Sequence, residues 1–251
     1  MAKTVPHIVQ YQGSKRILAP KILEYFPHRF ARLIEPFSGM AAITMAVAQQ
    51  HRAQKYYLND LNTPLVEILR EAVETPDILI AEYEKVWKEQ LSFNEGSVAH
   101  FYKVREEFNQ GNKTAANMLY LLARCVKGSV RYSSAGMFNQ SPDKRRKGTS
   151  PLTLAKNIYQ ISAMLKGKAE FTSMDYRKVL EQAVPGDLVY MDPPYQGVCN
   201  SRDNRYFSGI NFSEFVEAIA DLNTRGVDYS NDSKCNTIKF RIIRIITPTS
   251  R

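Results

Sequence analysis

The stretch Asp187-Leu-Val-Tyr-Met-Asp192-Pro-Pro-Tyr195 constrains the fold more than any other part of the chain. Residues 188–191 are apolar or aromatic and follow a Pro-Gly turn signal, so they predict a short buried strand. The two prolines fix φ and donate no backbone hydrogen, which ends the strand and stiffens the loop. At the carboxyl end of a parallel strand, the carboxylate of Asp192 would face the crevice in which open α/β sheets bind ligands.

The chemistry of this loop suits a planar amine. Asp192 and the carbonyl of Pro193 supply two acceptors, and the ring of Tyr195 supplies a stacking surface beside them. The alternative is a loop in which Asp192 only caps the following helix while the prolines close a turn.

A second strand-turn-helix pattern lies upstream. Residues 32–35 predict a strand, Gly39 lies in the turn, and the alanine-rich residues after it predict a helix. Residues 55–59 predict the next strand, which ends at Asp60, about twenty residues after Gly39. An acid at this spacing binds ribose hydroxyls in βαβ nucleotide sites, although Asp60 could also cap the helix expected from Thr63. No GxxxxGK[ST] motif is present, which argues against a P-loop NTPase.

The N-terminal segment Tyr11-Gln-Gly-Ser-Lys15-Arg16 precedes a helix predicted over residues 18–26. A basic residue after a turn of small residues can meet a carboxylate or a phosphate near a helix start. An ordinary surface turn is the alternative.

The strand-helix alternation is interrupted from residue 64 to residue 167. Five helical patterns occupy this region, at residues 65–72, 77–91, 98–108, 114–126 and 152–165. We therefore expect a helical insertion at 64–167 between two parts of one α/β domain, 1–63 and 168–251.

Turn residues and aromatics within the insertion, at residues 128–140, predict a hairpin. Arg131, Tyr132 and Asn139 are its candidates for contacting base edges. The basic loop that follows carries Lys144, Arg145 and Arg146, which either hold phosphates or form a solvated surface.

The alternation then resumes. Residues 168–171 predict a strand with Asp175-Tyr176 just past its end, residues 177–182 and 211–223 predict helices, and a further strand is expected from Gly226.

Composition limits the class of protein. The net charge is +9 and the pI is near 9.4, which favours a polyanionic partner. The three cysteines lack CxxC spacing and the four histidines stand apart, so we expect reduced thiols in a cytoplasm and no metal centre. No run approaches the roughly 18 apolar residues of a membrane span, and the N-terminus does not resemble a signal peptide.

These residues, in this order, resemble the Dam-type DNA adenine-N6 methyltransferases, the α-group of amino-methyltransferases. The resemblance covers roughly residues 8–228, and its most specific parts are Asp192-Pro-Pro-Tyr195 and Glu35-Pro-Phe-Ser-Gly39. The chain departs from the family at Ser14 and Ala41, each of which stands where the family has a glycine. The implied fold is the Rossmann-like α/β sheet of class I S-adenosylmethionine-dependent methyltransferases, with a helical target-recognition insertion.

The resemblance implies transfer of a methyl group from S-adenosylmethionine to the N6 amine of an adenine flipped out of a specific duplex DNA sequence. Asp192, Pro193 and Tyr195 would be catalytic. The implied cofactor-binding residues are Tyr11, Lys15, Glu35, Phe37, Ser38, Gly39, Asp60, Asp175, Tyr176 and Asp192. The implied DNA-binding residues are Arg124, Arg131, Tyr132, Asn139, Lys144, Arg145 and Arg146.

Two other functions remain open, a degenerate methyltransferase that binds DNA without turnover and a cytosine-N4 or RNA amino-methyltransferase. The implied partners are double-stranded DNA and a cognate restriction endonuclease.

The C-terminal stretch differs from the family. Residues 228–251 are polar and basic, and only residues 240–246 predict one of the strands that close the family's sheet. Either the chain is a shortened variant or this stretch is not the family's own sequence. A sheet without its edge strands would expose unpaired backbone, which puts full activity in question.

Overall fold

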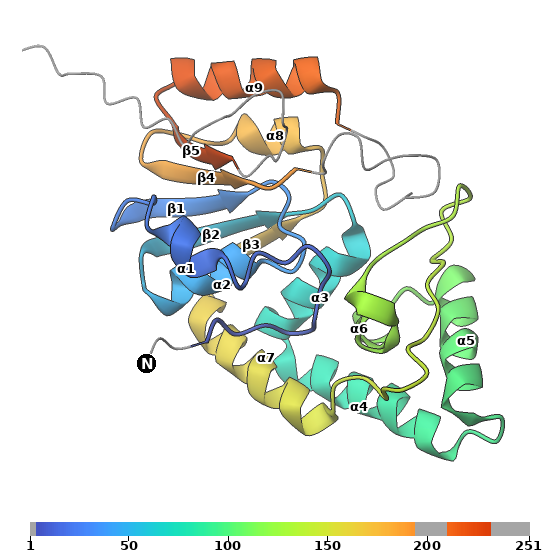
Figure 1. The fold of residues 1–251 in the computed structure, drawn as a ribbon. Helices are drawn as coiled ribbons and strands as arrows, with labels where there is room; N and C mark the ends of the chain where they lie inside the picture. The colour runs from blue at the N-terminus through green and yellow to red at the C-terminus, as the bar shows by residue number, and fades with distance from the viewer. Residues whose placement is uncertain (1–3, 194–209, 232–251) are drawn as a thin grey trace, which may run out of the picture.

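The computed structural model describes residues 4–193 and 210–231. Within these ranges, five parallel strands form one sheet in the order β3-β2-β1-β4-β5 (Figure 1). The strands are β1 (Phe30–Glu35), β2 (Ala53–Asn59), β3 (Ala169–Thr172), β4 (Asp187–Met191) and β5 (Asp228–Asn231). The prediction of a class I methyltransferase-like α/β fold is confirmed at the level of this parallel sheet with helices on both sides.

Helices cover the two faces of the sheet with separate apolar clusters. On one face, α1 (Ala19–Leu23) and α2 (Ala42–Gln49) pack with Leu33 and Leu188. On the other, α8 (Tyr176–Leu180) and α9 (Phe212–Thr224) pack against Val189 (Figure 1). Strand β4 is buried along its whole length because helices lie on both sides of it, which explains its continuous apolar sequence.

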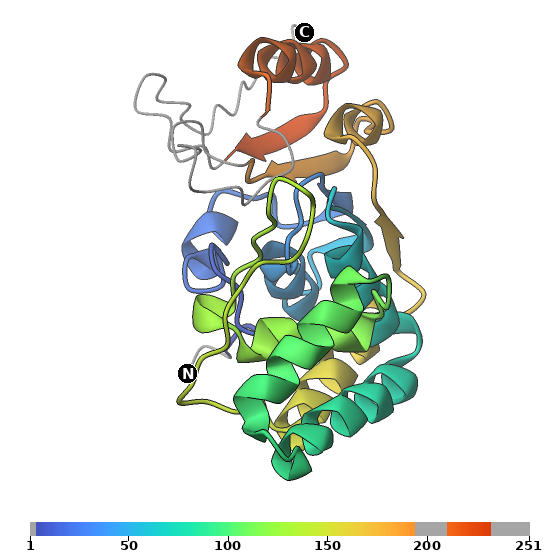
Figure 2. The same ribbon diagram turned by 90° about the vertical axis from the view of Figure 1, so that its right-hand side faces the viewer.

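The insertion between β2 and β3 is helical, as expected. It contains α3 (Thr63–Glu74), α4 (Pro76–Ser92), α5 (Gly96–Asn109), α6 (Ala115–Arg124), the short 3-10 turn η1 (Val126–Gly128) and α7 (Pro151–Leu165). Figure 2 shows the helices of the insertion beside the sheet. Their buried side chains join the cluster that covers the first face of the sheet, so the insertion and the sheet share one core. The division at residues 64 and 167 remains a prediction.

Two elements differ from expectation. The helix predicted over 18–26 is confined to α1, because Tyr25 and Phe26 close i→i+3 bonds and Pro27 disfavours helical backbone before it. The predicted hairpin has no regular ladder: residues 125–142, here called the hairpin arm, are joined by two isolated bridges, Cys125–Pro142 and Tyr132–Phe138. Residues 240–246, predicted as a strand, lie outside the described residues.

Across the described part of the chain, no helix combines the length and apolar character needed to cross a membrane.

Candidate functional site

A cavity of about 520 Å³ opens at the carboxyl ends of β1 and β4. The strand order reverses between these two strands, and open α/β sheets bind ligands at such a point. The volume falls within the range of about 300–1,000 Å³ that is usual for small-molecule sites. Its walls include every residue predicted to bind the cofactor: Tyr11, Lys15, Glu35, Phe37, Ser38, Gly39, Asp60, Asp175, Tyr176 and Asp192. Pro193 lies at its edge as well, whereas Tyr195 lies outside the described residues.

An ion pair connects the N-terminal segment to the end of β4. The ammonium of Lys15 donates to Oδ2 of Asp192, and both side chains are largely shielded from solvent. A neighbouring cation favours the ionised form of a carboxylate. Asp192 is therefore held as an acceptor at the mouth of the strand, and the basic residue of the N-terminal turn meets a carboxylate of this chain.

Glu35, the last residue of β1, is fully buried beneath the cavity. Its Oε1 accepts hydrogen bonds from the backbone N–H of Thr44 at 2.6 Å and from the Thr44 hydroxyl at 2.5 Å. Burial, reinforced by the negative charge of Asp192, raises the pKa of Glu35 from 4.5 to about 7 despite these bonds. Because this pKa lies near neutral pH, a cation bound beside Glu35 would shift the carboxyl to its ionised form.

Asp60 links the loops after β1 and β2. Its Oδ2 accepts from the backbone N–H of Gly39 and its Oδ1 from that of Asn62, both at 2.9 Å. Gly39 has a φ of +49°, and a β-carbon there would lie 3.2 Å from the Tyr11 ring, so the turn requires glycine. Asn62, and not Asp60, occupies the N-cap position of α3, so the capping interpretation of Asp60 is not the one observed.

Asn59 is a site residue that sequence reasoning missed. Its buried amide donates to the carbonyls of Pro36 and Met174, both at 2.9 Å, while its oxygen accepts from the Thr172 hydroxyl and the Met174 N–H. All four hydrogen-bonding positions of the amide are filled. The residue thereby fixes the two loops on either side of the cavity. Its position at the end of β2, directly before Asp60, was the one sequence signal that could have indicated this role.

Two aromatic rings, those of Phe37 and Tyr176, line one wall of the cavity, and the ring of Phe215 packs against both of them. The centroid of Phe37 lies 5.3 Å from that of Tyr176, and Phe215 of α9 lies 5.8 Å from Tyr176. Offset and tilted contacts at such distances add to the stability of the wall. The wall offers a planar apolar surface next to the acidic side chain of Asp175.

The hairpin arm contacts the cavity wall at Tyr132, which bonds to Asn62. Tyr132 is buried, packs on Phe138, and donates its hydroxyl to Oδ1 of Asn62 at 3.0 Å. The side chain of Tyr132 is therefore enclosed by the protein and is not presented on the surface, which differs from its predicted role as a DNA contact. Arg131 and Asn139 are exposed and paired through the backbone, with the Asn139 N–H donating to the Arg131 carbonyl at 2.8 Å.

Arg124 is a second correction. The side chain is 1% exposed, and its guanidinium donates to the carbonyls of Asp143 at 2.9 Å and Ser97 at 3.2 Å. A group enclosed in this way cannot reach DNA. It anchors the basic loop instead.

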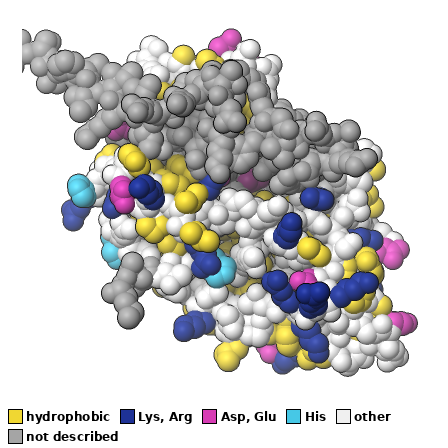
Figure 3. All heavy atoms as spheres, in the orientation of Figure 1, with side chains coloured by type: hydrophobic (Ala, Val, Ile, Leu, Met, Phe, Trp, Pro, Cys, Tyr) yellow, Lys and Arg dark blue, Asp and Glu magenta, His cyan; other side chains and the backbone are white. Residues whose placement is uncertain are grey.

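The basic loop is held by its backbone and exposes its charged side chains. Gln90 donates to the carbonyl of Lys147 at 3.1 Å, and Tyr83 to that of Thr149 at 2.6 Å. Lys144, Arg145 and Arg146 are exposed, and Figure 3 shows Lys and Arg side chains gathered over the helical insertion. The geometry is that of a rigid loop presenting positive charge.

A family model described as D12 class N6 adenine-specific DNA methyltransferase matches residues 11–240. The chain is 29% identical over 230 residues to a DNA N-6-adenine-methyltransferase of Escherichia phage P1, an alignment that covers 87% of this chain and 28% of the phage protein. It is 30% identical over 195 residues to a type II methyltransferase of Lactococcus lactis subsp. cremoris, covering 74% of this chain and 64% of that protein. A DNA adenine methylase of Serratia marcescens is 27% identical over 190 residues, which is 74% of this chain and 66% of that protein. The chain thus spans less than two thirds of each of these relatives.

Proposed function

The chain belongs to the D12 class of N6 adenine-specific DNA methyltransferases, and from this premise we propose that it transfers a methyl group from S-adenosylmethionine to the N6 amine of an adenine in duplex DNA. The observation that carries the proposal is the position of Asp192 at the β1–β4 switch point, paired with Lys15 and bordering the cavity. The relative from Lactococcus lactis is named a type II methyltransferase, so the proposal includes a cognate restriction endonuclease. It also includes action in the cytoplasm, as expected from the scattered cysteines.

The cavity suits S-adenosylmethionine, a nucleoside that carries a sulfonium and an amino-acid group. Asp60 offers a carboxylate to ribose hydroxyls, and the Phe37–Tyr176 wall offers a surface to the adenine. Glu35 lines the cavity, where its carboxylate would balance the positive charges of the sulfonium and the amino group of S-adenosylmethionine. When bound, this cofactor supplies an electrophilic methyl group.

The residues at the end of β4 would activate the target amine. The lone pair of an adenine amine is delocalised into the ring, so the amine is a poor nucleophile. Hydrogen bonds from its two protons to Asp192 and to the Pro193 carbonyl favour a pyramidal nitrogen and free the lone pair for in-line attack. Catalysis then consists mainly of positioning and electrostatic stabilisation.

The target amine lies inside the duplex, so the adenine must be extruded before it can reach Asp192. Tyr195 is proposed to stack on the extruded base, an interaction worth about 1–3 kcal/mol per base in single-strand binders. Arg131 and Asn139 are proposed to contact the target sequence, and Lys144, Arg145 and Arg146 its phosphates. The two buried residues of this region, Arg124 and Tyr132, are left out of the interface.

The experiment that tests the proposal is nucleoside analysis of plasmid DNA from cells that lack adenine methylation and express the chain. N6-methyldeoxyadenosine in the digest supports it. N4-methyldeoxycytidine, or no modified deoxynucleoside, contradicts it.

Cofactor affinity should depend on pH through Glu35. The raised pKa means that the carboxyl favours folding below about pH 4.5 and that this contribution is lost as the pH rises through about 7. A bound cation reverses the preference of Glu35 for its protonated form, because the cation is stabilised only by the ionised carboxylate. Affinity for S-adenosylmethionine should therefore rise several-fold between about pH 6 and 8, and calorimetric titration at several pH values measures it.

Two variants identify the group responsible. Glu35→Gln should bind more weakly and lose the pH dependence. Asp175→Asn should bind more weakly but keep it, because hydrogen bonds from Arg177 lower the pKa of Asp175 and move its titration below this pH range. A pH dependence that survives in Glu35→Gln would exclude Glu35 as its source.

Charge reversal in the basic loop should weaken DNA binding and lower its dependence on salt. Each lost phosphate contact reduces the slope of log K against log salt by about 0.9, so Lys144→Glu with Arg145→Glu should reduce it by about 2. The control is Lys156→Glu with Lys166→Glu, an equal change of charge at exposed positions on and next to α7. Equal slopes for the two double variants, measured by fluorescence anisotropy, would assign the loop to ordinary solvated surface.

A further inference from the structure

A chain of hydrogen bonds runs through the helical insertion, where α4, α5 and α6 pack on one another (Figure 1). Nδ1 of His100, on α5, lies 3.0 Å from the hydroxyl of Tyr120, on α6. The same hydroxyl bonds to Oε1 of Gln90, on α4, at 3.4 Å, and Nε2 of Gln90 bonds to the Lys147 carbonyl at 3.1 Å. These three buried side chains, here called the donor relay, therefore connect the interior of the insertion to the basic loop, residues 143–149.

The hydrogens of the donor relay can point in only one direction. The Lys147 carbonyl only accepts, so the amide nitrogen of Gln90 faces it and the amide oxygen faces Tyr120. That oxygen also only accepts, so Tyr120 gives its single hydroxyl hydrogen to Gln90 and must accept from His100. Nδ1 of His100 therefore carries a hydrogen.

The charge states of the two rings agree with this direction. Burial lowers the pKa of His100 from its ordinary value of 6.5, although Glu89 opposes the shift, so the ring is neutral near neutral pH. Burial raises the pKa of Tyr120 from its ordinary value of 10, against the effect of Arg124, so the hydroxyl keeps the hydrogen that it donates.

The second ring nitrogen of His100 shows what selects this tautomer. Nε2 then bears a lone pair, and it lies 3.5 Å from a carboxylate oxygen of Glu89. Two acceptors at that distance repel each other, so Glu89 alone would favour a hydrogen on Nε2. The bonds that end at the Lys147 carbonyl are therefore what hold the hydrogen on Nδ1.

The basic loop depends on such bonds for its position. Residues 143–149 form no helix or strand, and side chains from α4 and α6 bond to the carbonyls of Asp143, Lys147 and Thr149. Lys147 directly follows the three exposed cations of the loop. Fixing its carbonyl therefore fixes where those cations stand.

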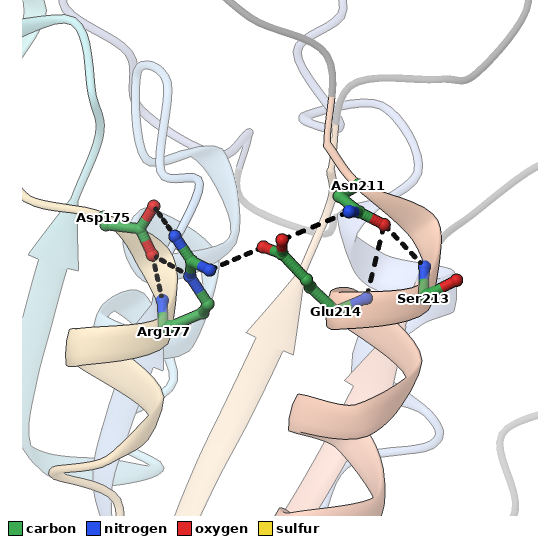
Figure 4. A network of polar contacts seen from close by, with 5 residues as sticks. All are labelled: Asp175, Arg177, Asn211, Ser213 and Glu214. Atoms are coloured by element: carbon green, nitrogen blue, oxygen red, sulfur yellow. Dashed lines mark hydrogen bonds and ion pairs between the residues drawn. The ribbon is translucent and has the colours of Figure 1, made fainter.

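Burial distinguishes the donor relay from the polar network at the rim of the cavity, where Arg177 bonds to Asp175 and Glu214 (Figure 4). The side chains of that network are 40–50% exposed, so water can replace a bond that is lost. Water does not reach the donor relay in this way, so a lost bond leaves a buried polar group unpaired.

We propose that Gln90 is a positioning residue for DNA binding. The bonds from His100 and Tyr120 fix the orientation of its amide, and the amide holds the basic loop where its cations meet the phosphates of duplex DNA. The inference rests on the proposed function, and within it on the contact between the basic loop and DNA. Being buried, the three side chains act on DNA only through the loop.

Gln90→Met is the first test, because methionine has the length of glutamine and no hydrogen to donate. Amide hydrogen exchange of residues 145–148 should become about tenfold faster, since the loop opens more readily. Affinity for mixed-sequence duplex DNA should fall about fivefold, and the slope of log K against log salt should decrease by about 1. The KM for DNA should rise while kcat stays within about twofold, because the reacting groups are unchanged.

Ser162→Ala is the matched control. The buried hydroxyl of Ser162 donates to the Val73 carbonyl at 2.8 Å, so it also joins a side chain of the insertion to a backbone carbonyl, but between α7 and α3. Both variants should lower the melting temperature. Only Gln90→Met should change the exchange of the loop and the salt slope.

Tyr120→Phe interrupts the donor relay without touching the loop, and it keeps the test decisive should Gln90→Met fail to fold. NMR correlation of ring nitrogens with ring protons should show the Nδ1–H tautomer of His100 in the unaltered protein. In Tyr120→Phe the hydrogen should move to Nε2 and face Glu89. Loss of the signal in His100→Gln identifies it. Affinity for DNA should fall about twofold in Tyr120→Phe, less than in Gln90→Met.

Loop exchange and a salt slope that stay unchanged in Gln90→Met, or an Nε2–H tautomer in the unaltered protein, overturn the inference and leave the proposed function intact. An equal change in Ser162→Ala overturns it as well. If charge reversal at Lys144 and Arg145 leaves the salt slope unchanged, the basic loop does not contact DNA and the inference fails. Methyl transfer is then decided by nucleoside analysis alone.

Discussion

Replacing Asp192 with asparagine should lower the rate of methyl transfer by about a thousandfold while DNA and cofactor binding change only a few-fold. Removing one stabilising group from a preorganised site typically costs about 10²–10³ in turnover, and this substitution also removes the negative charge that Lys15 holds in place. The asparagine amide can turn a donor toward the target amine, so one acceptor is lost and a repulsive contact is gained. Single-turnover rates with saturating DNA measure the effect.

Asp187→Asn is the matched control, since it changes a carboxylate at the other end of the same strand. Asp187 is buried, accepts from Arg32 at 2.7 Å and from the Val184 N–H at 3.0 Å, and lies outside the cavity wall within the described residues. The substitution should lower the melting temperature and leave the turnover of the folded enzyme unchanged. An Asp192→Asn variant that retains a tenth of the activity, or that loses DNA binding as strongly as turnover, would contradict the assigned role.

Replacing Gly128 with alanine should be the most destabilising single change of a glycine in the described chain. Its φ is +57°, and a β-carbon would lie 2.1 Å from the carbonyl oxygen of Gln10. That contact is with backbone, so the N-terminal segment has to move, and the bond from the Gln12 N–H to the Gly128 carbonyl, at 2.8 Å, is lost. Strain and overpacking together cost about 3 kcal/mol, or on the order of 10 °C in melting temperature.

The same change should weaken cofactor binding, because the displaced segment continues into Tyr11 and Lys15 at the cavity. Gly167→Ala is the control: its φ of +72° imposes similar backbone strain, but a β-carbon there meets nothing within 4 Å. It should cost about 1 kcal/mol and leave cofactor affinity unaltered. If the two variants melt at the same temperature, the close packing between the N-terminal segment and η1 is not a source of stability.

The local sequence pattern was sufficient to predict the strands whose carboxyl ends border the cavity. The apolar run before Asp192 predicts β4, and the strand-turn-helix around Gly39 predicts β1 and α2, because buried parallel strands and their turns have a short-range signature. Parallel strands place their carboxyl ends at one edge of the sheet, which is why Glu35, Asp60 and Asp192 all line the same cavity.

Contacts between distant segments were not predictable in the same way. Lys15 and Asp192 are 177 residues apart, and nothing local in either segment indicates that they pair. Arg124 was misassigned because an arginine near a helix end is usually exposed, and its burial depends on carbonyls of Ser97 and Asp143. Asn59 was missed for the same reason, since its partners come from loops that only the folded sheet brings together.

Two expectations lie outside the described residues, the stacking ring of Tyr195 and the strand at 240–246. The family match extends to residue 240, so it includes part of the C-terminal stretch, residues 228–251. Where the described chain reaches this stretch, β5 pairs with β4 and extends the sheet as a parallel strand.

The most direct test of the account is transfer of labelled methyl groups from S-adenosylmethionine to mixed-sequence duplex DNA by the purified chain, followed by nucleoside analysis. We expect the label in N6-methyldeoxyadenosine, with transfer abolished in Asp192→Asn and retained in Asp187→Asn. Label in another nucleoside, or no transfer by a folded chain that binds the cofactor, would contradict the proposal that this chain is an active adenine-N6 methyltransferase.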